Sequence, residues 1–290
     1  MNAIVPDALA AAFQRRPPDL HKYAAGVVAI IGGCAQYANA PVMAALGARA
    51  GGAGLVRLVA SAESRIAAAA FVPEATFSEL GPDDAPPQAD VTAAGMGLGA
   101  TKSAETLLDR ILSSDAERIV LDADALTLLA KWRSAGKHVS SHTTRTVVLT
   151  PHAGEAARLL GCTAAEIQAA RPDAVRRIAD AYHAVAVLKG HHTLVAAPGD
   201  TKVFECHAGN PFMALGGMGD LLAGVLSARW ARLVKANPPT DPETAFAAAC
   251  SAVWLHATAS DALVKANPPE DPSVANTARK IASLRVELER

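Results

Sequence analysis

The segment richest in residues that could do chemistry is the pentapeptide Gly-Gly-Met-Gly-Asp at residues 216–220, which leads directly into an apolar helical stretch. Glycines let backbone N–H groups approach an anion closely, and the N-terminus of a helix adds partial positive charge. The segment therefore predicts a turn that binds a nucleotide phosphate. Asp220 is our candidate catalytic base, because it could accept a proton from a hydroxyl that attacks the terminal phosphorus. The alternative is a tight turn in which Asp220 is only a helix cap, worth ~1 kcal/mol.

A second group of polar residues, Thr150, His152 and Glu155, follows an apolar run and opens a helix. Ligands of open α/β sheets gather at the carboxyl ends of strands, so we expect His152 and Glu155 near a ligand. Glu155 is our candidate metal residue, because Mg²⁺ usually keeps several waters and takes few protein carboxylates. The alternative is that Glu155 only caps the helix near Thr150.

A third group comprises Lys189, Gly190, His191, His192 and Thr193 at the end of another apolar run. A lysine followed by glycine at such an end can reach a phosphate as a point charge. Metal binding by the two histidines is disfavoured, because adjacent side chains seldom point at one centre and no third ligand has the usual spacing. We expect this loop to contact a nucleotide. The glycine loops at residues 29–40 and 95–99 lack the dinucleotide-binding order Gly-x-Gly-x-x-Gly, and predict close backbone contact with a ligand.

Short apolar runs and Ala-rich stretches indicate the elements that position these groups. Six runs predict buried strands, at residues 27–31, 55–59, 91–94, 119–121, 147–149 and 185–188. Stretches between many of them predict helices, at residues 41–50, 61–70, 104–112 and 164–181. The alternation predicts a three-layer α/β/α fold with a mainly parallel sheet.

The rest of the chain departs from this alternation. Residues 193–197 and 202–206 flank a Pro-Gly-Asp turn and predict an antiparallel hairpin at the sheet edge. Residues 219–234 and 243–264 predict helices, followed by a charged tail. We expect an N-terminal segment, residues 1–25, and a single domain over residues 26–290.

Composition excludes several classes of protein. The chain has 290 residues, 51% of them hydrophobic and 19% charged, which is typical of a globular protein. A net charge of −1 gives no support for nucleic acid as a partner. The four cysteines are scattered, which favours reduced thiols and a cytoplasmic location over a zinc site or disulfide framework. The N-terminal residues do not form a signal pattern, and the apolar runs are too short to span a membrane.

Taken together, these segments resemble the ADP-dependent NAD(P)H-hydrate dehydratases of the ribokinase-like superfamily, from about residue 26 to about residue 228. The segments that match in order and spacing are Gly32-Gly33, Tyr37, Ala40, residues 95–99, 121–126 and 150–155, Lys189-Gly190 and residues 209–220. The resemblance implies a ribokinase-like fold. It also implies that hydrated NADH or NADPH is dehydrated to the normal cofactor while ADP is consumed to AMP and phosphate, with Mg²⁺ as the metal ion. Phosphate leaves more readily than hydroxide, so phosphorylation of the ring hydroxyl would precede elimination.

The resemblance also implies roles for individual residues. Ala40, Gly99 and His152 would contact the hydrated dinucleotide. Asp220 would meet both ligands. The residues that would contact the adenine nucleotide are Lys189, Gly190, His191, His192, Thr193 and Gly219. The family further suggests a homo-oligomer, and a separate epimerase, because the stretch before Gly26 is too short to be an epimerase domain.

Two positions distinguish this chain within the superfamily. His152 favours the dehydratases, since the related vitamin-precursor kinases usually have Asn there. Met218 stands where the dehydratases commonly have Ser, which leaves only its backbone N–H as a donor. The alternatives are therefore an ATP-dependent small-molecule kinase of the ribokinase-like superfamily and a catalytically weak nucleotide-binding homologue.

Overall fold

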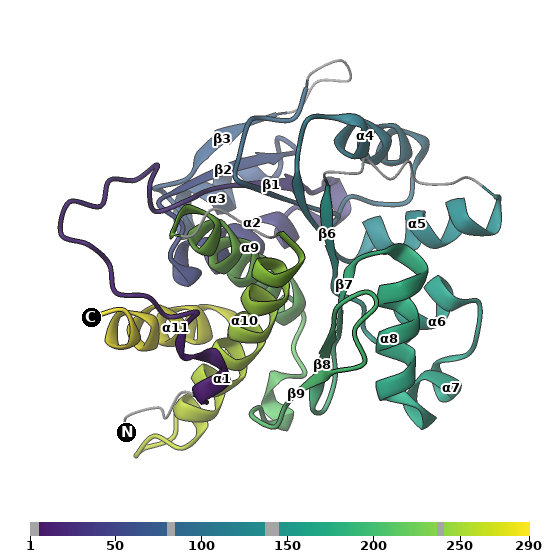
Figure 1. Cartoon of the computed structure of the whole chain (residues 1–290). Coiled ribbons are helices and arrows are strands. Elements are labelled where there is room, and N and C mark those ends of the chain that lie inside the picture. Colours follow the sequence, from purple (N-terminus) through teal and green to yellow (C-terminus); the bar gives the residue numbers. More distant parts are fainter. Residues whose placement is uncertain (1–5, 80–84, 137–144, 237–240) are drawn as a thin grey trace.

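A nine-stranded sheet forms the centre of the computed structural model, which describes residues 6–79, 85–136, 145–236 and 241–290 (Figure 1). The strand order is β3-β2-β1-β4-β5-β6-β7-β8-β9. The strands that pair in parallel are β1 (Val27–Gly32), β2 (Leu55–Ala60), β3 (Thr76–Ser78), β4 (Val91–Ala94), β5 (Arg118–Leu121), β6 (Thr146–Leu149) and β7 (Val185–Leu188). The predicted edge hairpin is confirmed as β8 (Thr193–Ala196) and β9 (Val203–Cys206), with β8 antiparallel to both neighbours.

Helices cover both faces of this sheet, which confirms the predicted three-layer α/β/α fold (Figure 1). The helices packed on one side are α1 (Asp7–Ala10), α2 (Ala40–Gly51), α3 (Ser64–Phe71), α9 (Met218–Ala236), α10 (Asp241–Val264) and α11 (Val274–Leu288). Those on the other side are α4 (Lys102–Ser113), α5 (Asp124–Ser134), α6 (Ala153–Leu160), α7 (Ala164–Ala169) and α8 (Arg171–Tyr182). None of the helices in the described ranges has the length and apolar character needed to cross a bilayer.

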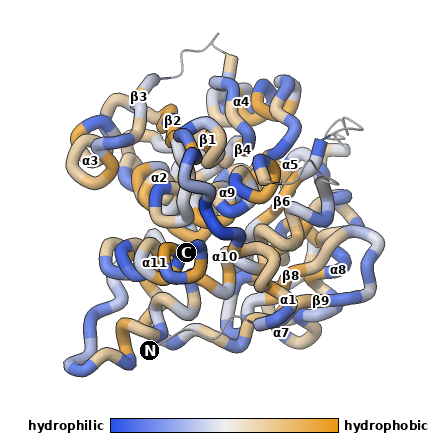
Figure 2. Tube along the Cα trace, turned by 60° about the vertical axis from the view of Figure 1, so that its left-hand side comes forward, coloured by the Kyte–Doolittle hydropathy of each residue, from blue (hydrophilic) through white to orange (hydrophobic). Residues whose placement is uncertain are grey.

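The strands form two cores because their side chains alternate between the faces. Val28 and Ile30 of β1 pack under α2 and α9, whereas Ile31 faces α4 and α5. Val187 and Leu188 of β7 divide in the same way. Figure 2 shows hydrophobic residues along the strands and the helices beside them, with hydrophilic stretches in the outer turns. Burial on both faces explains why the sequence reads as short continuous apolar runs.

One predicted helix differs from the structure, and one strand was not predicted. The helix expected over residues 164–181 is two helices, α7 and α8, with Ala170 between them in a non-helical conformation. Pro172 accounts for the break, because proline is accepted in the first turn of a helix but not in its interior. The short strand β3 was not predicted, because it has only three residues and its side chains are largely exposed.

The charged tail is ordered as α11 and joins the N-terminal segment to α9. Glu289 is buried and accepts hydrogen bonds from Arg16 at 2.7 Å and Arg285 at 2.8 Å, and it also pairs with the fully buried Arg229. Burial opposes ionisation of Glu289, but these arginines hold its pKa below the ordinary value. The division at residue 25 stays a prediction, although Phe13 packs into the core beside α10.

Close packing between α2 and α9 fixes where α9 begins. A Cβ atom on Gly224 of α9 would lie 1.8 Å from the carbonyl oxygen of Ala44, and one on Gly47 of α2 would lie 2.1 Å from that of Leu221. Only glycine allows the two backbones to approach this closely. Because α9 starts at Met218, this contact places the turn at residues 216–220 against the sheet.

We expect Gly224→Ala to lower the free energy of unfolding by about 1–3 kcal/mol, because the added methyl group meets backbone rather than a movable side chain. Urea unfolding of the variant and the wild type measures the difference. Gly216→Ala is the matched control, since a Cβ there meets nothing within 4 Å. Equal stability of Gly224→Ala and the wild type would contradict this expectation, because it would show that α2 and α9 make room for the methyl group without any loss of stability.

Candidate active site

The carboxyl ends of β5, β6 and β7 place three charged side chains around one point. Asp122 follows β5, Glu155 lies in the first turn of the helix that follows β6, and Lys189 follows β7. The strands are neighbours and parallel, so their ends meet at the same edge of the sheet. Lys189 and Asp122 form the shortest contact of the group, with Nζ 2.6 Å from Oδ1.

Lys189 is the positive centre of this cluster. Its Nζ is also 3.8 Å from Oε2 of Glu155, and its side chain is largely buried. Burial alone would lower the pKa of Lys189, but Asp122 and Glu155 raise it above the ordinary value. The amine therefore stays charged and offers a fixed positive group at the sheet edge.

Asp220 lies in the first turn of α9, close to the same cluster. Burial, together with the negative charge of Asp122, raises its pKa from 3.8 to about 7, while Lys189 opposes the shift. Asp124 and Glu155 add to the rise. A carboxyl group with this pKa is suited to accept a proton near neutral pH.

Glu155 has a structural role that the sequence left as an alternative. Its Oε2 accepts a hydrogen bond from the backbone N–H of His152 at 2.8 Å, and the His152 ring in turn accepts from the N–H groups of Gly154 and Glu155. This is a capping box at the start of α6, with His152 rather than Thr150 as the cap. Burial is the main cause that raises the pKa of Glu155 above its ordinary value. Its role as a metal residue stays a prediction.

The backbone between Asp122 and Asp124 is strained. Ala123 has φ 51° and ψ −118°, a conformation that residues with a side chain rarely adopt and that costs about 1–3 kcal/mol. The strained turn points Asp122 toward Lys189, while Oδ2 of Asp124 accepts a hydrogen bond from the N–H of Gly99 at 2.8 Å. Strain of this kind is concentrated at functional sites.

The predicted glycine turn precedes α9 as expected. Gly217 has φ 92°, and a Cβ there would lie 2.0 Å from the sulfur of Met43, so the turn requires glycine. A Cβ on Gly219 would lie 3.3 Å from Nζ of Lys189, which places the start of α9 beside the charged cluster. Met218 is buried, packs in the core and also lines the cavity beside the turn.

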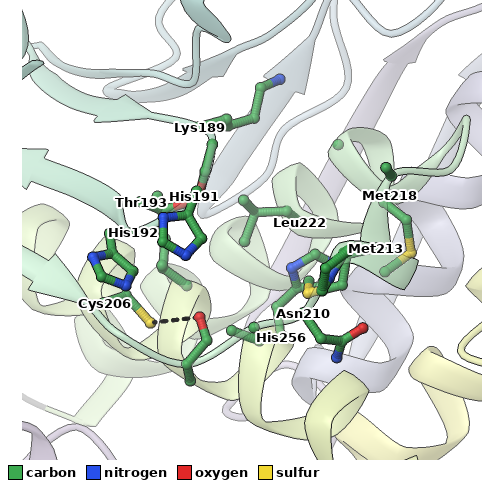
Figure 3. A pocket seen from close by; sticks show the side chains of 18 of the residues that line it. Lys189, His191, His192, Thr193, Cys206, Asn210, Met213, Met218, Leu222 and His256 are labelled. Carbon is green, nitrogen blue, oxygen red and sulfur yellow. Dashed lines mark hydrogen bonds between the residues drawn. The ribbon is translucent and has the colours of Figure 1, made fainter. Parts of the chain in front are cut away.

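A cavity of about 600 Å³ opens between this turn and the loop after β7 (Figure 3). All six residues predicted to contact a nucleotide line this cavity, and His152 also lies on the lining. The remaining lining residues include Asn210 and Leu215 in the segment before α9, Leu222, and Val253 and His256 of α10. The fold therefore brings the six residues that were predicted to contact a nucleotide together around one cavity.

The sequence analysis gave no role to two further residues at the cavity. Nδ2 of Asn210 donates to Oγ of Ser260 at 3.1 Å and to Oδ1 of Asp261 at 2.8 Å, which holds the segment before α9 against α10. His256 is buried, and burial lowers its pKa to about 4, so its ring is neutral. Its Nε2 has no hydrogen-bond partner among the described residues.

The residues predicted to contact the dinucleotide separate into two places. Ala40 and Gly99 do not line the cavity; Ala40 is the first residue of α2, Gly99 lies in the loop after β4, and Ala40 lies close to Gly97 of that loop. His152 lies instead on the cavity. Asp220 does not line the cavity either, although Gly219 beside it does, and the charges that act on it include those of Lys189 and Asp124.

Asp122 is the main residue that the sequence analysis missed. It lies in residues 121–126, one of the segments that carry the resemblance to the dehydratases, but the sequence analysis gave it no role. The available signal was its position directly after a buried strand, like that of Lys189 after β7. The strand order that makes these two residues neighbours was not available from the sequence.

Comparison with known proteins decides the family. The sequence model described as NAD(P)H-hydrate dehydratase matches residues 28–280 of this chain. This chain belongs to the NAD(P)H-hydrate dehydratase family. It is 38% identical over 257 residues to the ADP-dependent (S)-NAD(P)H-hydrate dehydratase of Neisseria meningitidis, an alignment that covers 87% of this chain and 81% of the relative.

Two further members of the NAD(P)H-hydrate dehydratase family extend the comparison. The bifunctional NAD(P)H-hydrate repair enzyme of Escherichia coli is 37% identical, and the alignment covers 86% of this chain but 45% of that enzyme. The crystal structure of the ADP/ATP-dependent NAD(P)H-hydrate dehydratase of Bacillus subtilis, co-crystallised with ATP and Mg²⁺, superposes with a TM-score of 0.80 at 26% identity. That match covers 97% of this chain and 96% of the other, which confirms the ribokinase-like fold expected from the sequence.

We expect Asp220→Asn to stabilise this dehydratase-family fold at pH 8. A carboxyl whose folded pKa is raised from 3.8 to about 7 destabilises the folded state above the lower value, and the loss is complete above the higher one. The variant should therefore exceed the wild type by about 1 kcal/mol or more at pH 8, after allowing for solvent screening, and match it near pH 4. Urea unfolding at both pH values measures this. A gain of the same size at pH 4, or no gain at pH 8, would contradict the raised pKa.

Proposed function

We propose that this protein catalyses the ADP-dependent dehydration of hydrated NADH or NADPH, yielding the normal cofactor, AMP and phosphate. The observation that supports this most strongly is Asp220, whose pKa of about 7 makes it a base at neutral pH next to the cationic Lys189. The membership of the family adds support, since the relative from Neisseria meningitidis is named for this ADP-dependent reaction.

The first chemical step is a phosphoryl transfer. The ring hydroxyl of the hydrate attacks the terminal phosphorus of ADP, the bond from that phosphorus to the bridging oxygen breaks, and AMP leaves. Asp220 accepts the hydroxyl proton, and Lys189 offsets negative charge that spreads over the phosphoryl oxygens. The start of α9 adds backbone N–H groups that favour an anion at the same point.

The second step is elimination. The carbon–oxygen bond to the new phosphate ester breaks, phosphate departs, and loss of a proton from the neighbouring ring carbon restores the double bond. Phosphate is a far better leaving group than hydroxide, which is the reason for consuming ADP. The net reaction balances as hydrate plus ADP giving the nicotinamide cofactor, AMP and phosphate.

The arrangement of the site supports separate places for the two ligands. The cavity is proposed to hold the adenine nucleotide against the loop of Lys189 to Thr193 and against Gly219. The hydrated ring is proposed to lie toward Ala40 and Gly99, with Asp220 between. His152 lines the cavity, so it would meet the substrate only where the two ligands approach each other.

Mg²⁺ fits the charges of this site. Asp122, Glu155 and Asp220 surround one ammonium group, which leaves an excess of carboxylate oxygens, the ligands that Mg²⁺ prefers. We propose that Glu155 holds the ion through water. When bound, the ion would offset charge on the phosphates during transfer.

Neither alternative reading is favoured by the comparisons. A hydroxyethylthiazole kinase from Pyrococcus horikoshii superposes with a TM-score of 0.61 at 15% identity, which is a likeness of fold alone. A catalytically weak homologue was suggested by Met218, which is buried but also lines the cavity. In our proposal the phosphate contacts come from the backbone N–H groups of the turn, which a methionine at this position leaves in place.

We also propose a cytoplasmic, homo-oligomeric protein that works with a separate NAD(P)H-hydrate epimerase. The four cysteines are all free, as in a reducing compartment. Relatives named bifunctional repair enzymes support a link to a second repair activity. Size-exclusion chromatography coupled to light scattering measures the oligomeric state.

We expect Asp220→Asn to lower ADP-dependent dehydration by about 10²–10⁴-fold, because the amide keeps the shape of the carboxylate but not its basicity. The assay mixes protein, hydrated NADH, ADP and Mg²⁺ and follows the return of nicotinamide absorbance. The dehydratase of Neisseria meningitidis serves as the positive control. Unchanged turnover in the variant would remove the proposed role of Asp220, and no turnover in the wild type beside an active control would overturn the proposed function.

A further inference from the structure

A group of metal-ligating side chains lies outside the charged cluster, at the open end of the β8–β9 hairpin. It consists of His192, Glu205 and His207, whose nearest ligand atoms all lie within 4.8 Å of one another. Nδ1 of His192 is 3.0 Å from Oε1 of Glu205, and Nδ1 of His207 is 3.8 Å from the same oxygen. Both imidazoles thus approach one carboxylate oxygen.

The hairpin register brings these residues together. Thr193 of β8 pairs with Cys206 of β9, so the residues just outside this pair, His192 and His207, face each other across the hairpin. Their ring centroids are 4.6 Å apart. Glu205 lies two residues before His207 along the strand, which places both side chains on the same face of β9. The sequence analysis considered His191 and His192 as the pair of ligands, whereas the structure combines His192 with two residues from the opposite side of the hairpin.

The backbone at His192 is also unusual. His192 has φ 54°, in the left-handed region that is strained for a residue with a side chain. The strain turns its ring toward Glu205, and the ring of His191 stacks on it with centroids 4.0 Å apart. A half-exposed pair of histidine and glutamate contributes at most about 1 kcal/mol, which does not by itself account for a strained backbone.

The spacing of the ligand atoms suits a transition metal ion. Zinc is bound at about 2.0–2.1 Å by histidine nitrogen, which in a tetrahedral site separates neighbouring ligand atoms by about 3.3 Å. The two measured separations, 3.0 and 3.8 Å, lie on either side of this value. Two imidazoles and one carboxylate favour Zn²⁺, Co²⁺ or Ni²⁺ over Mg²⁺, which takes oxygen ligands.

We propose that His192, Glu205 and His207 form a binding site for a divalent transition metal ion at the mouth of the cavity. The ion replaces the ion pair between His192 and Glu205 and joins the ends of β8 and β9. Three protein ligands leave one coordination position open to solvent. His192 also lines the cavity, where Figure 3 shows its ring beside that of His191, so the ion would lie next to the proposed nucleotide.

The test is titration of the full chain with Zn²⁺ alone, without nucleotide or Mg²⁺, by isothermal calorimetry. We expect one ion per chain in the wild type and at least about tenfold weaker binding in His207→Gln. His207 and Glu205 do not line the cavity, so their variants keep every residue of the proposed nucleotide site, including His192. His21→Gln is the matched control, because it removes an exposed imidazole that is not part of the cluster and should bind Zn²⁺ like the wild type.

Thermal unfolding gives a second readout. Zn²⁺ should raise the melting temperature of the wild type and of His21→Gln, but not that of His207→Gln or Glu205→Gln, because an ion that binds only the folded state stabilises it. Equal Zn²⁺ affinity in the wild type and His207→Gln, or no binding in the wild type, would overturn the site. Neither measurement involves ADP or hydrate, so failure here is independent of failure of the proposed dehydration.

Discussion

The salt bridge between Lys189 and Asp122 joins the ends of β7 and β5 across the end of β6, and the chemistry of the site depends on it. One ammonium group lies among the carboxylates of Asp122, Glu155 and Asp220, so the charges do not balance. The pair between Lys189 and Asp122 is the tightest, which leaves Asp220 with less of the stabilising positive charge. The raised pKa of Asp220 follows from this arrangement together with its burial. A bound cation would balance this excess of negative charge, to which a phosphate-bearing ligand adds.

Packing on the other side of the sheet holds that arrangement in place. The glycine contacts between α2 and α9 fix the position at which α9 begins. The missing side chain of Gly219 leaves room for Lys189 beside the first turn of α9. The strained Ala123 keeps Asp122 and Asp124 pointing to different partners, one to Lys189 and one to Gly99. The strained backbone at Ala123 costs free energy, and the packing of the two cores of the sheet offsets this cost.

Much of the fold could be predicted from local patterns. Short apolar runs bounded by glycine identified six strands, and the Pro-Gly-Asp turn identified the edge hairpin. The break at Ala170 could have been predicted too, since Pro172 is visible in the sequence. The strand β3 could not, because three residues, two of them exposed, are too few to show a periodic signal.

The site was predictable only in part, for a different reason. Lys189, Glu155 and Asp220 each follow a recognisable local signal, a strand end or a glycine turn. Their mutual distances depend on the order of strands in the sheet, which one sequence does not specify. Asp122 and the cluster of His192, Glu205 and His207 require pairings between distant segments, and for that reason they became visible only in three dimensions.

The central claim, that burial and unbalanced charge make Asp220 a base near neutral pH, can be measured without substrate. Carboxyl carbon NMR of the wild-type protein, with the Asp220 signal assigned by its loss in the Asp220→Asn variant, reports the titration of this side chain directly. The account predicts a midpoint near pH 7 for Asp220 in the absence of ligands and metal ions. A midpoint near pH 4, as for an exposed aspartate, would contradict it.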